Sequence, residues 1–277
     1  MIKIENVEVM GWEAAIRGMR NPMNSWEKSD SKTINMTLKK HELAPGVETL
    51  DYEPCVPYTS IGPNDFDLMK RLCNAGTDHR KFMRMITVYL DITAPLYWWK
   101  EFDTYKVGTV ANSCSTMHKI ADKEFTLDDF SHEHLYDADH ERQWITSAIV
   151  DEDPDSMHKV FLTPLEMLRC TIEMLNRYRE DYLETGDKDD WWQLIQLLPT
   201  TYNQKRTVML NYEVLANIYK SRKNHKLDEW RVHETPEEHK FRNKDFSSGM
   251  WGFCDWIESL PYSELITKKG ENNNEHD

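Results

Sequence analysis

Two groups of polar side chains in this sequence have types and spacing that could do chemistry. The first lies in an acidic, histidine-bearing stretch over residues 118–160. It contains a His-x-His pair and an Asp-x-Asp-His run, formed by His132, His134, Asp137, Asp139 and His140. Imidazole and carboxylate groups together could hold Zn²⁺, Mn²⁺ or Fe²⁺, so a metal-dependent hydrolase is one hypothesis. A solvated acidic loop with incidental histidines explains the same residues, and we assign no metal ligand.

The second group of polar side chains lies closer to the C-terminus. The sequence predicts a helix from Gln204 to Arg222. One stripe of that helix would carry Asn211, Leu215, Ile218 and Arg222. Polar groups at both ends of an apolar stripe are either surface residues or ligand contacts where the helix enters a pocket. The pattern leaves both interpretations open.

The stretch from Arg84 to His118 is expected to position such a site. Alternation of apolar residues predicts a strand whose buried face carries Ile86, Val88, Leu90 and Ile92. Thr93 is expected to cap a short aromatic helix, with Pro95 in its first turn. A polar loop is expected over Val107–Ser115. A strand, a short helix and a loop in this order commonly hold a rigid site.

The rest of the chain is expected to form a single domain over residues 1–265, followed by a disordered tail at 266–277. Residues 27–64 are polar and are interpreted as a long excursion, with a possible strand at Ser31–Lys39. Thr163-Pro164-Leu165-Glu166 predicts a helix start, because Thr caps, Pro suits the first turn and Glu closes a capping box.

Composition limits the classes of function. The formal net charge of −14 disfavours binding to a nucleic-acid backbone, which requires a basic surface. The five cysteines are scattered and form no CxxC pair, which suits reduced thiols in a cytoplasm-like compartment. No apolar signal core or membrane-length apolar run is present in the sequence. We therefore expect a cytoplasmic protein that binds no membrane.

An ordered series of sequence patches resembles the flavin-dependent thymidylate synthases, the ThyX family, over roughly residues 3–262. The first patch is AAIRGMRNPMNSW, the second is NAGTDHRKF with His79, and the third is the strand leading to Ala94-Pro95 and an aromatic helix. The last patch is LLP followed by Asn211, Asn217 and Arg222. It is the most persuasive, because several polar identities recur at fixed separations.

The sequence departs from this family at its signature, RHRxxSxNExSxR. Tyr105-Lys106-Val107 stands where the leading triplet is expected, or Thr104-Tyr105-Lys106 if the register shifts by a residue. In the first register only Asn112 and Ser115 agree, and the arginines, histidine and glutamate are absent. The arginine that precedes Leu-Pro in the family is replaced by Ile195. Each lost charge-assisted bond to phosphate is worth ~1.5–3 kcal/mol, so nucleotide affinity is the property most affected.

The resemblance implies an α/β fold, a twisted sheet packed with long helices, and an FAD cofactor. It implies cofactor contacts at His79, Asn211, Asn217, Tyr105 and Lys106. It implies nucleotide contacts at Arg222, Ser115, Asn112 and Lys100. Arg20 and Lys100 are candidates to replace the lost cations. No catalytic side chain is assigned, because reduced flavin performs the hydride chemistry in this family.

The function implied is that of a flavin-dependent protein acting on a pyrimidine deoxynucleotide similar to dUMP. If the family reaction is kept, it would be a methyl transfer in dTMP biosynthesis that uses NADPH and methylenetetrahydrofolate. The family also implies a homotetramer. The alternative is a catalytically silent protein of the same fold that binds a nucleotide.

Overall fold

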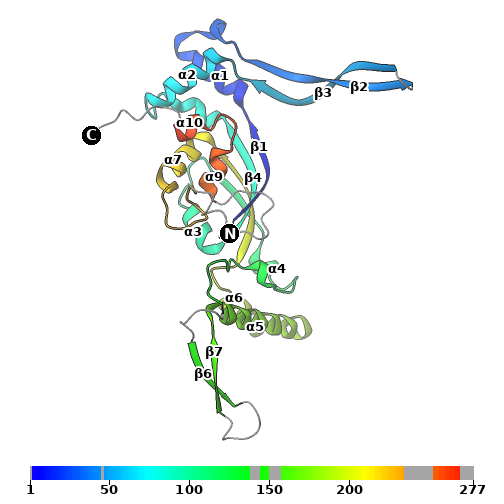
Figure 1. Cartoon of the computed structure of the whole chain (residues 1–277), viewed down its shortest axis with the longest axis vertical. Helices are drawn as coiled ribbons and strands as arrows, with labels where there is room; N and C mark the ends of the chain where they lie inside the picture. The colour runs from blue at the N-terminus through cyan, green and yellow to red at the C-terminus, as the bar shows by residue number, and fades with distance from the viewer. Residues whose placement is uncertain (1, 45–46, 138–143, 150–156, 234–251, 269–277) are drawn as a thin grey trace.

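The computed structural model describes residues 2–44, 47–137, 144–149, 157–233 and 252–268. Its centre is an antiparallel sheet with the strand order β1-β4-β8-β5 (Figure 1). These strands are β1 (Lys3–Met10), β4 (Thr87–Pro95), β8 (Asn203–Asn211) and β5 (Val110–Ser113). The predicted α/β class is confirmed.

Strand β4 has the predicted buried face. Val88, Leu90 and Ile92 are fully buried, whereas Tyr89 between them is exposed. The predicted helix cap at Thr93 is wrong, because the strand continues to Pro95 and Thr93 pairs with Lys205 of β8. Helix α3 (Leu96–Phe102) therefore begins one residue after Pro95, which is its N-cap.

The predicted helix from Gln204 to Arg222 is wrong in its first half. That half is strand β8, which pairs with β4 along its whole length, and helix α7 (Tyr212–Arg222) follows directly. The predicted loop at Val107–Ser115 is also partly wrong, because β5 lies inside it and pairs with β8 at the sheet edge. Both corrections have one cause: pairing with a neighbouring strand supplies the backbone hydrogen bonds.

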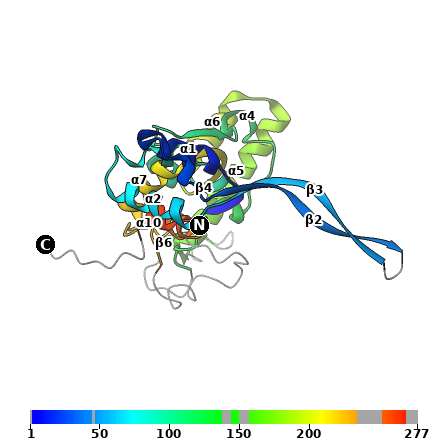
Figure 2. The same cartoon turned by 90° about the horizontal axis from the view of Figure 1, so that it is seen from above.

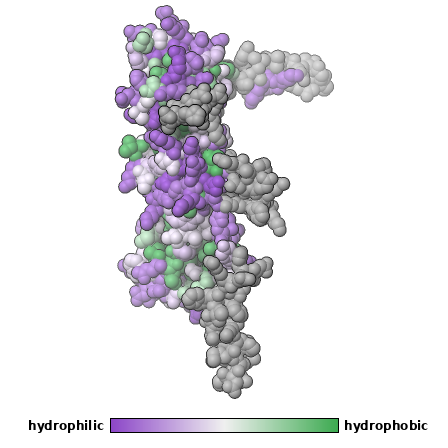
Figure 3. All heavy atoms as spheres, turned by 60° about the vertical axis from the view of Figure 1, so that its left-hand side comes forward, coloured by the Kyte–Doolittle hydropathy of each residue, from purple (hydrophilic) through white to green (hydrophobic). Residues whose placement is uncertain are grey.

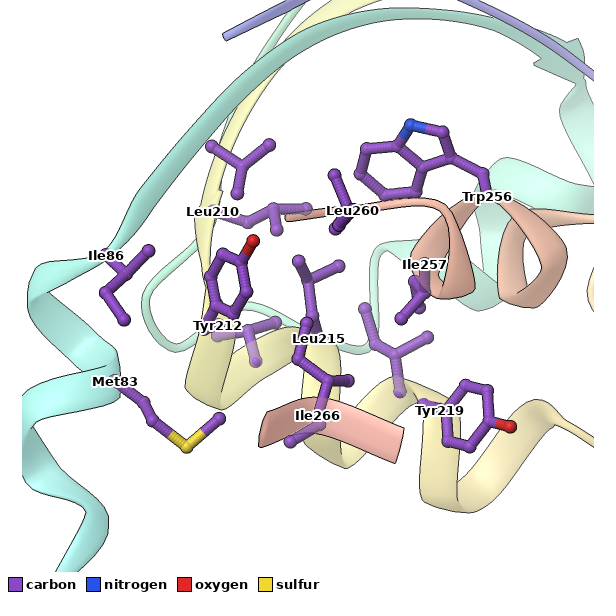
Figure 4. Packing of buried hydrophobic residues seen from close by; sticks show 14 of the residues in the cluster. Met83, Ile86, Leu210, Tyr212, Leu215, Tyr219, Trp256, Ile257, Leu260 and Ile266 are labelled. Carbon is purple, nitrogen blue, oxygen red and sulfur yellow. The ribbon is translucent and has the colours of Figure 1, made fainter. Parts of the chain in front are cut away.

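Helices cover one face of the sheet. They are α1 (Trp12–Arg20), α2 (Pro63–Asn74), α7, α9 (Phe253–Glu258) and α10 (Glu264–Thr267). Figure 4 shows Leu215 and Tyr219 of α7 beside Ile257 of α9 and Ile266 of α10. Ile266 is buried, so the predicted disordered tail is wrong at its first residues, and residues 269–277 lie outside the described part.

A two-stranded arm leaves the sheet between α1 and α2. It consists of β2 (Lys32–Ala44) and β3 (Val47–Ser60), which pair only with each other in the described structure. Figure 2 shows that the arm projects away from the body of the protein. The predicted excursion at 27–64 thus contains the expected strand, now longer, and a second strand paired with it.

A second hydrophobic cluster lies around α5 (Pro164–Thr185) and α6 (Lys188–Leu197). The hairpin of β6 (Trp144–Ile149) and β7 (Met157–Leu162) precedes α5. The capping box is confirmed: Thr163 Oγ1 accepts from the Glu166 N–H at 3.1 Å, and Glu166 Oε2 accepts from the Thr163 N–H at 2.7 Å. Among the described residues, no helix combines the length and apolarity needed to cross a membrane.

Candidate functional site

Helix α7 carries the polar residues predicted near the C-terminus. Asn211 is the last residue of β8 and the N-cap of α7, and its Oδ1 accepts from the Val214 N–H at 3.0 Å. This bond satisfies one of the amide groups left open at a helix start. Asn211 therefore has a structural role, and its Nδ2 amide remains for other contacts.

Asn217 lies on an exposed part of α7 that faces the 3-10 helix η3 (Arg80–Met85). Its Oδ1 accepts from Nη2 of Arg80 at 3.2 Å. Arg80 Nε also forms an ion pair with Oε2 of Glu213 at 2.9 Å, one turn earlier on α7. His79 is the exposed N-cap of η3. Arg80 therefore links η3, which begins after His79, to α7, which carries Asn217.

Arg222 ends α7 and makes a network of polar contacts. Its Nη1 lies 2.6 Å from Oε2 of Glu101, and its Nε donates to the Tyr105 hydroxyl at 2.9 Å. His225 Nε2 lies 2.8 Å from the same Nη1. The guanidinium also lies 5.2 Å from the ring centre of Trp230, a cation–π distance. Arg222 and Tyr105 are therefore brought together, but Arg222 already has a carboxylate partner.

The segment after Tyr105 folds against the start of α7. Gly108 has φ +78°, a conformation that favours glycine, and a Cβ there would lie 3.0 Å from Asn211 Nδ2. The hydroxyl of the neighbouring Thr109 is buried and has no hydrogen-bond partner within the described residues. Lys106 and Lys100 are exposed, and neither forms an ion pair in the part of the chain that the structure describes.

Asn112 and Ser115 lie apart from this network. Asn112 pairs with Thr207 at the edge of the sheet, and both residues are exposed. Ser115 caps the short helix α4 (Thr116–Lys119), with its Oγ accepting from the His118 N–H at 3.2 Å. Among the described residues, no hydrogen bond joins either side chain to Arg222. Within one chain, the predicted nucleotide contacts therefore lie in two places: Arg222 at the end of α7, and Asn112 and Ser115 near the edge of the sheet.

Arg20 has a role different from the predicted one. It is buried, and its Nε donates to Asp65 Oδ1 at 2.6 Å. Two further nitrogens donate to the carbonyls of Ser25 and Lys28, each at 3.0 Å. Its donors hold the chain between α1 and the arm, so Arg20 is not available to replace a lost phosphate contact.

The histidine-rich stretch shows no metal-binding geometry where it is described. Within the described residues, no group of three or more potential ligands is close enough to hold an ion. His134 Nε2 instead lies 3.3 Å from Asp228 Oδ2, and His132 Nδ1 lies 2.8 Å from the Phe130 carbonyl. Asp139 and His140 fall outside the described residues, so that part of the hypothesis is not tested.

Five residues of this site were not predicted from the sequence: Arg80, Glu101, Glu213, His225 and Trp230. Arg80 directly follows His79, and that position was the available signal. Glu101 and Trp230 had no comparable signal, because each reaches Arg222 from a different element of the fold. Their roles depend on tertiary packing and not on local spacing.

The central sheet, its helical face and a polar-ended helix after β8 together define an α/β fold of the flavin-dependent thymidylate synthase type. The structure is similar to thymidylate synthase X from Helicobacter pylori with FAD and dUMP, at 13% sequence identity and a TM-score of 0.53 over 97% of this chain and 98% of that one. A second structure of the H. pylori enzyme with FAD and dUMP gives 12% identity and a TM-score of 0.52, covering 96% and 98%.

The structure of a UMP/dUMP methylase, PolB from Streptomyces cacaoi, gives 12% identity and a TM-score of 0.47 over 86% of this chain and 84% of that chain. No family model and no curated protein matches the sequence. The similarity to the H. pylori enzyme shows the fold of this chain.

Proposed function

We propose that the protein is a flavin-dependent protein that acts on a pyrimidine deoxynucleotide similar to dUMP. The observation that carries the proposal is the arrangement around α7, where Asn211 caps the helix, Asn217 contacts Arg80 of η3, and Arg222 contacts Tyr105 and Glu101 of α3. The similarity in fold to a thymidylate synthase crystallised with FAD and dUMP supports the same function. The family's homotetrameric assembly is part of this proposal.

FAD fits the residues around the start of α7. Gly108 has φ +78°, and a Cβ there would lie 3.0 Å from Asn211 Nδ2, so this position favours glycine beside Asn211. The buried Thr109 hydroxyl lacks a protein partner among the described residues. In the proposal, Asn211, Asn217 and His79 hold the cofactor, with Tyr105 and Lys106 beside them. Bound flavin would supply hydride transfer, and NADPH and methylenetetrahydrofolate would be its co-substrates if the family reaction is kept.

The nucleotide phosphate requires cations, which Arg222 and Lys100 would supply. Lys100 precedes Glu101 on α3, so it lies on the element that contacts Arg222. Asn112 and Ser115 would contact the nucleotide from the sheet edge. Because one chain does not unite them with Arg222, the proposal places them in a site completed by another copy of the chain.

The test of this proposal combines cofactor and nucleotide binding. Purified protein should retain FAD after gel filtration, and Asn217→Ala should weaken retention without unfolding the protein. Arg222→Ala should reduce affinity for dUMP by roughly tenfold or more, as measured by isothermal titration calorimetry. Unchanged dUMP affinity in Arg222→Ala would remove the role given to this arginine.

A second candidate is a catalytically silent nucleotide-binding protein. The observation that favours it is the ion pair between Arg222 and Glu101, together with the loss of the signature arginines at Tyr105-Lys106-Val107. This candidate predicts that dUMP raises the melting temperature without FAD and that no turnover occurs with FAD, NADPH and methylenetetrahydrofolate. Turnover to dTMP would reject it.

A further inference from the structure

The β2–β3 arm exposes apolar side chains on the face that points away from the body of the protein. On its other face, Thr33 Oγ1 lies 3.3 Å from Thr59 Oγ1 and donates to Glu13 Oε2 of α1 at 3.4 Å. The next residues, Ile34 and Tyr58, lie opposite each other in register, and strand alternation places both on the outward face. They are 46% and 60% exposed. Exposed apolar groups that lie together mark an interaction surface.

Within the described structure, the arm has no neighbouring strand beyond its own pair. β2 and β3 pair only with each other among the described strands, and an isolated two-stranded ribbon is marginally stable in water. The 13 residues of β2 span ~43 Å. Figure 3 shows the arm standing off the body, with hydrophilic residues along its described outer part, where Lys39, Lys40 and His41 are exposed. A second surface that packs on the arm would supply the missing stabilisation.

The root of the arm is fixed to the body by hydrogen bonds. The buried Asp65 carboxylate of α2 accepts from the hydroxyls of Ser29 and Ser31, each at 2.6 Å. Asp30 Oδ1 accepts from the Asp65 N–H at 3.1 Å. Ser31 Oγ accepts from the Gly62 N–H at 3.0 Å. These bonds join both ends of the arm to the start of α2 and set its direction. Figure 2 shows that this direction leads away from the body, so the arm does not cover its own sheet.

The face of the central sheet opposite the helices carries a second exposed apolar surface. Tyr89 of β4 lies opposite Met209 of β8, which lies opposite Val110 of β5. Tyr89, Val110 and Met10 of β1 are exposed. We call these four residues the outer sheet row. A hollow of about 480 Å³ lies beside it and is lined in part by Glu8, Met10 and Tyr89. This hollow can receive apolar side chains from a partner.

A second copy of the chain is the partner that these two surfaces fit. Each chain carries one outward arm face and one outer sheet row, so two copies that exchange arms cover all four surfaces with twofold symmetry. One face of the arm measures ~43 Å by ~10 Å, so two reciprocal contacts would bury roughly 1,700 Å² in total, the area of a standard stable interface. Two arms packed only on each other would bury about half as much, close to the range of crystal contacts.

The charges beside the two surfaces favour the same pairing. Lys32 shares the outward arm face with Ile34, by the two-residue period of β2, and is exposed. Glu8 lies opposite Tyr89 at the end of the outer sheet row and is also exposed. Arm exchange therefore brings a basic group toward an acidic one beside the apolar contact. Such complementarity steers association and disfavours wrong partners.

We propose that two copies of the chain exchange their arms. The Ile34–Tyr58 face of each arm packs on the outer sheet row of the other copy, around Tyr89. The inference rests on the assembly of identical chains in the proposed function, and it adds the element that joins two of them.

The molar mass of the full-length protein tests arm exchange, measured by gel filtration with light scattering in the absence of FAD and nucleotide. Ile34→Asp and Tyr89→Asp should each lower the mass to half that of the parent or less, because each buries a charge in both reciprocal contacts. Asn35→Asp is the matched control, since Asn35 is exposed on the other face of the arm and should keep the parent mass. Circular dichroism verifies that each variant is folded.

A mixture of the two variants tests which surfaces meet. An Ile34→Asp chain has an intact sheet row and a Tyr89→Asp chain has an intact arm, so a mixed pair regains one of its two contacts. The mass of the mixture should therefore exceed that of either variant alone. If Tyr89→Asp fails to fold, Met10→Asp on the same row takes its place.

Four results overturn arm exchange: a monomeric parent, the parent mass in Tyr89→Asp, a mixture no heavier than its components, or equal dissociation by Ile34→Asp and Asn35→Asp. Failure of the proposed function gives a different result. A colourless protein that dissociates in Ile34→Asp and recovers in the mixture would reject the flavin function and keep arm exchange. A yellow protein that keeps its mass in Ile34→Asp would do the reverse.

Discussion

Arg222 and Glu101 form an ion pair in which Nη1 of the arginine lies 2.6 Å from Oε2 of the glutamate. The side chains are 18% and 33% exposed, so water screens this pair less than it screens a surface pair. A ligand phosphate can bind Arg222 only if it displaces the Glu101 carboxylate or binds beside that negative charge. Glu101 therefore controls how strongly the best-placed cation of the site can bind an anion.

Removing the charge of Glu101 should increase nucleotide affinity. Glu101→Gln keeps the shape of the side chain but frees Arg222, so the dUMP affinity should rise by roughly tenfold in calorimetric titration. Asp103→Asn is the matched control, because Asp103 pairs with Arg206 at 2.8 Å and not with Arg222. A fall in affinity in Glu101→Gln would mean that Glu101 orients Arg222 for the ligand.

Asn211 combines a structural and a proposed cofactor role, and two substitutions separate them. Asn211→Ala removes the cap of α7 and should lower the free energy of unfolding by about 1 kcal/mol. Asn211→Asp keeps a capping oxygen but lacks the Nδ2 donor, so it should retain stability and lose FAD affinity. Urea denaturation and FAD retention measure the two effects; loss of stability in both variants would contradict the separation.

The buried pair of Arg20 and Asp65 is predicted to stabilise the fold and not to bind ligand. Burial raises the pKa of Asp65, but hydrogen bonds from Ser29, Ser31 and Arg20 outweigh it and lower the pKa below its ordinary value. Asp65→Ala leaves a buried guanidinium without its carboxylate, which should lower the free energy of unfolding by roughly 3–5 kcal/mol.

The matched control for this pair lies on the same helix. Asp67 of α2 forms an exposed pair with Arg71, so Asp67→Ala should change the free energy of unfolding by less than about 1 kcal/mol. Urea denaturation compares the two variants. Equal costs would show that burial does not strengthen the Arg20–Asp65 pair.

The face of the sheet opposite the helices carries a carboxylate, Asp91, that should affect stability in acid. Hydrogen bonds from Thr207, Asn6 and Lys205 lower the pKa of Asp91 from 3.8 to about 2. Its contribution to stability is complete above pH 3.8 and is lost as pH falls toward about 2. Asp91→Asn should therefore be less stable than the parent near neutral pH, and the two stability curves should converge below this window. Parallel curves would contradict this assignment.

Local signals in the sequence predicted those elements that need no distant partner. The capping box at Thr163 and Glu166 depends on neighbouring residues, and the alternation around Leu90 reflects a strand with one covered face. Strand β8 was missed because Arg206 occupies an inward position. Its guanidinium lies 4.2 Å from the ring centre of Trp99, so a charged residue interrupts the apolar period.

The candidate site was predictable in its positions but not in its partners. The spacing of Asn211, Asn217 and Arg222 was read from the sequence, and all three lie at or on α7. The pairing of Arg222 with Glu101 joins residues far apart in the chain, so no local pattern reports it. A family pattern can therefore locate a site while leaving its electrostatics undetermined.

Retention of FAD tests the central claim most directly. The protein is mixed with excess FAD, freed from unbound cofactor by gel filtration and scanned for visible flavin absorbance, in parallel with Asn217→Ala. We predict that the parent protein stays yellow at near one flavin per chain and that the variant loses most of its colour. A colourless parent protein would contradict the flavin-dependent function and leave the silent nucleotide-binding candidate.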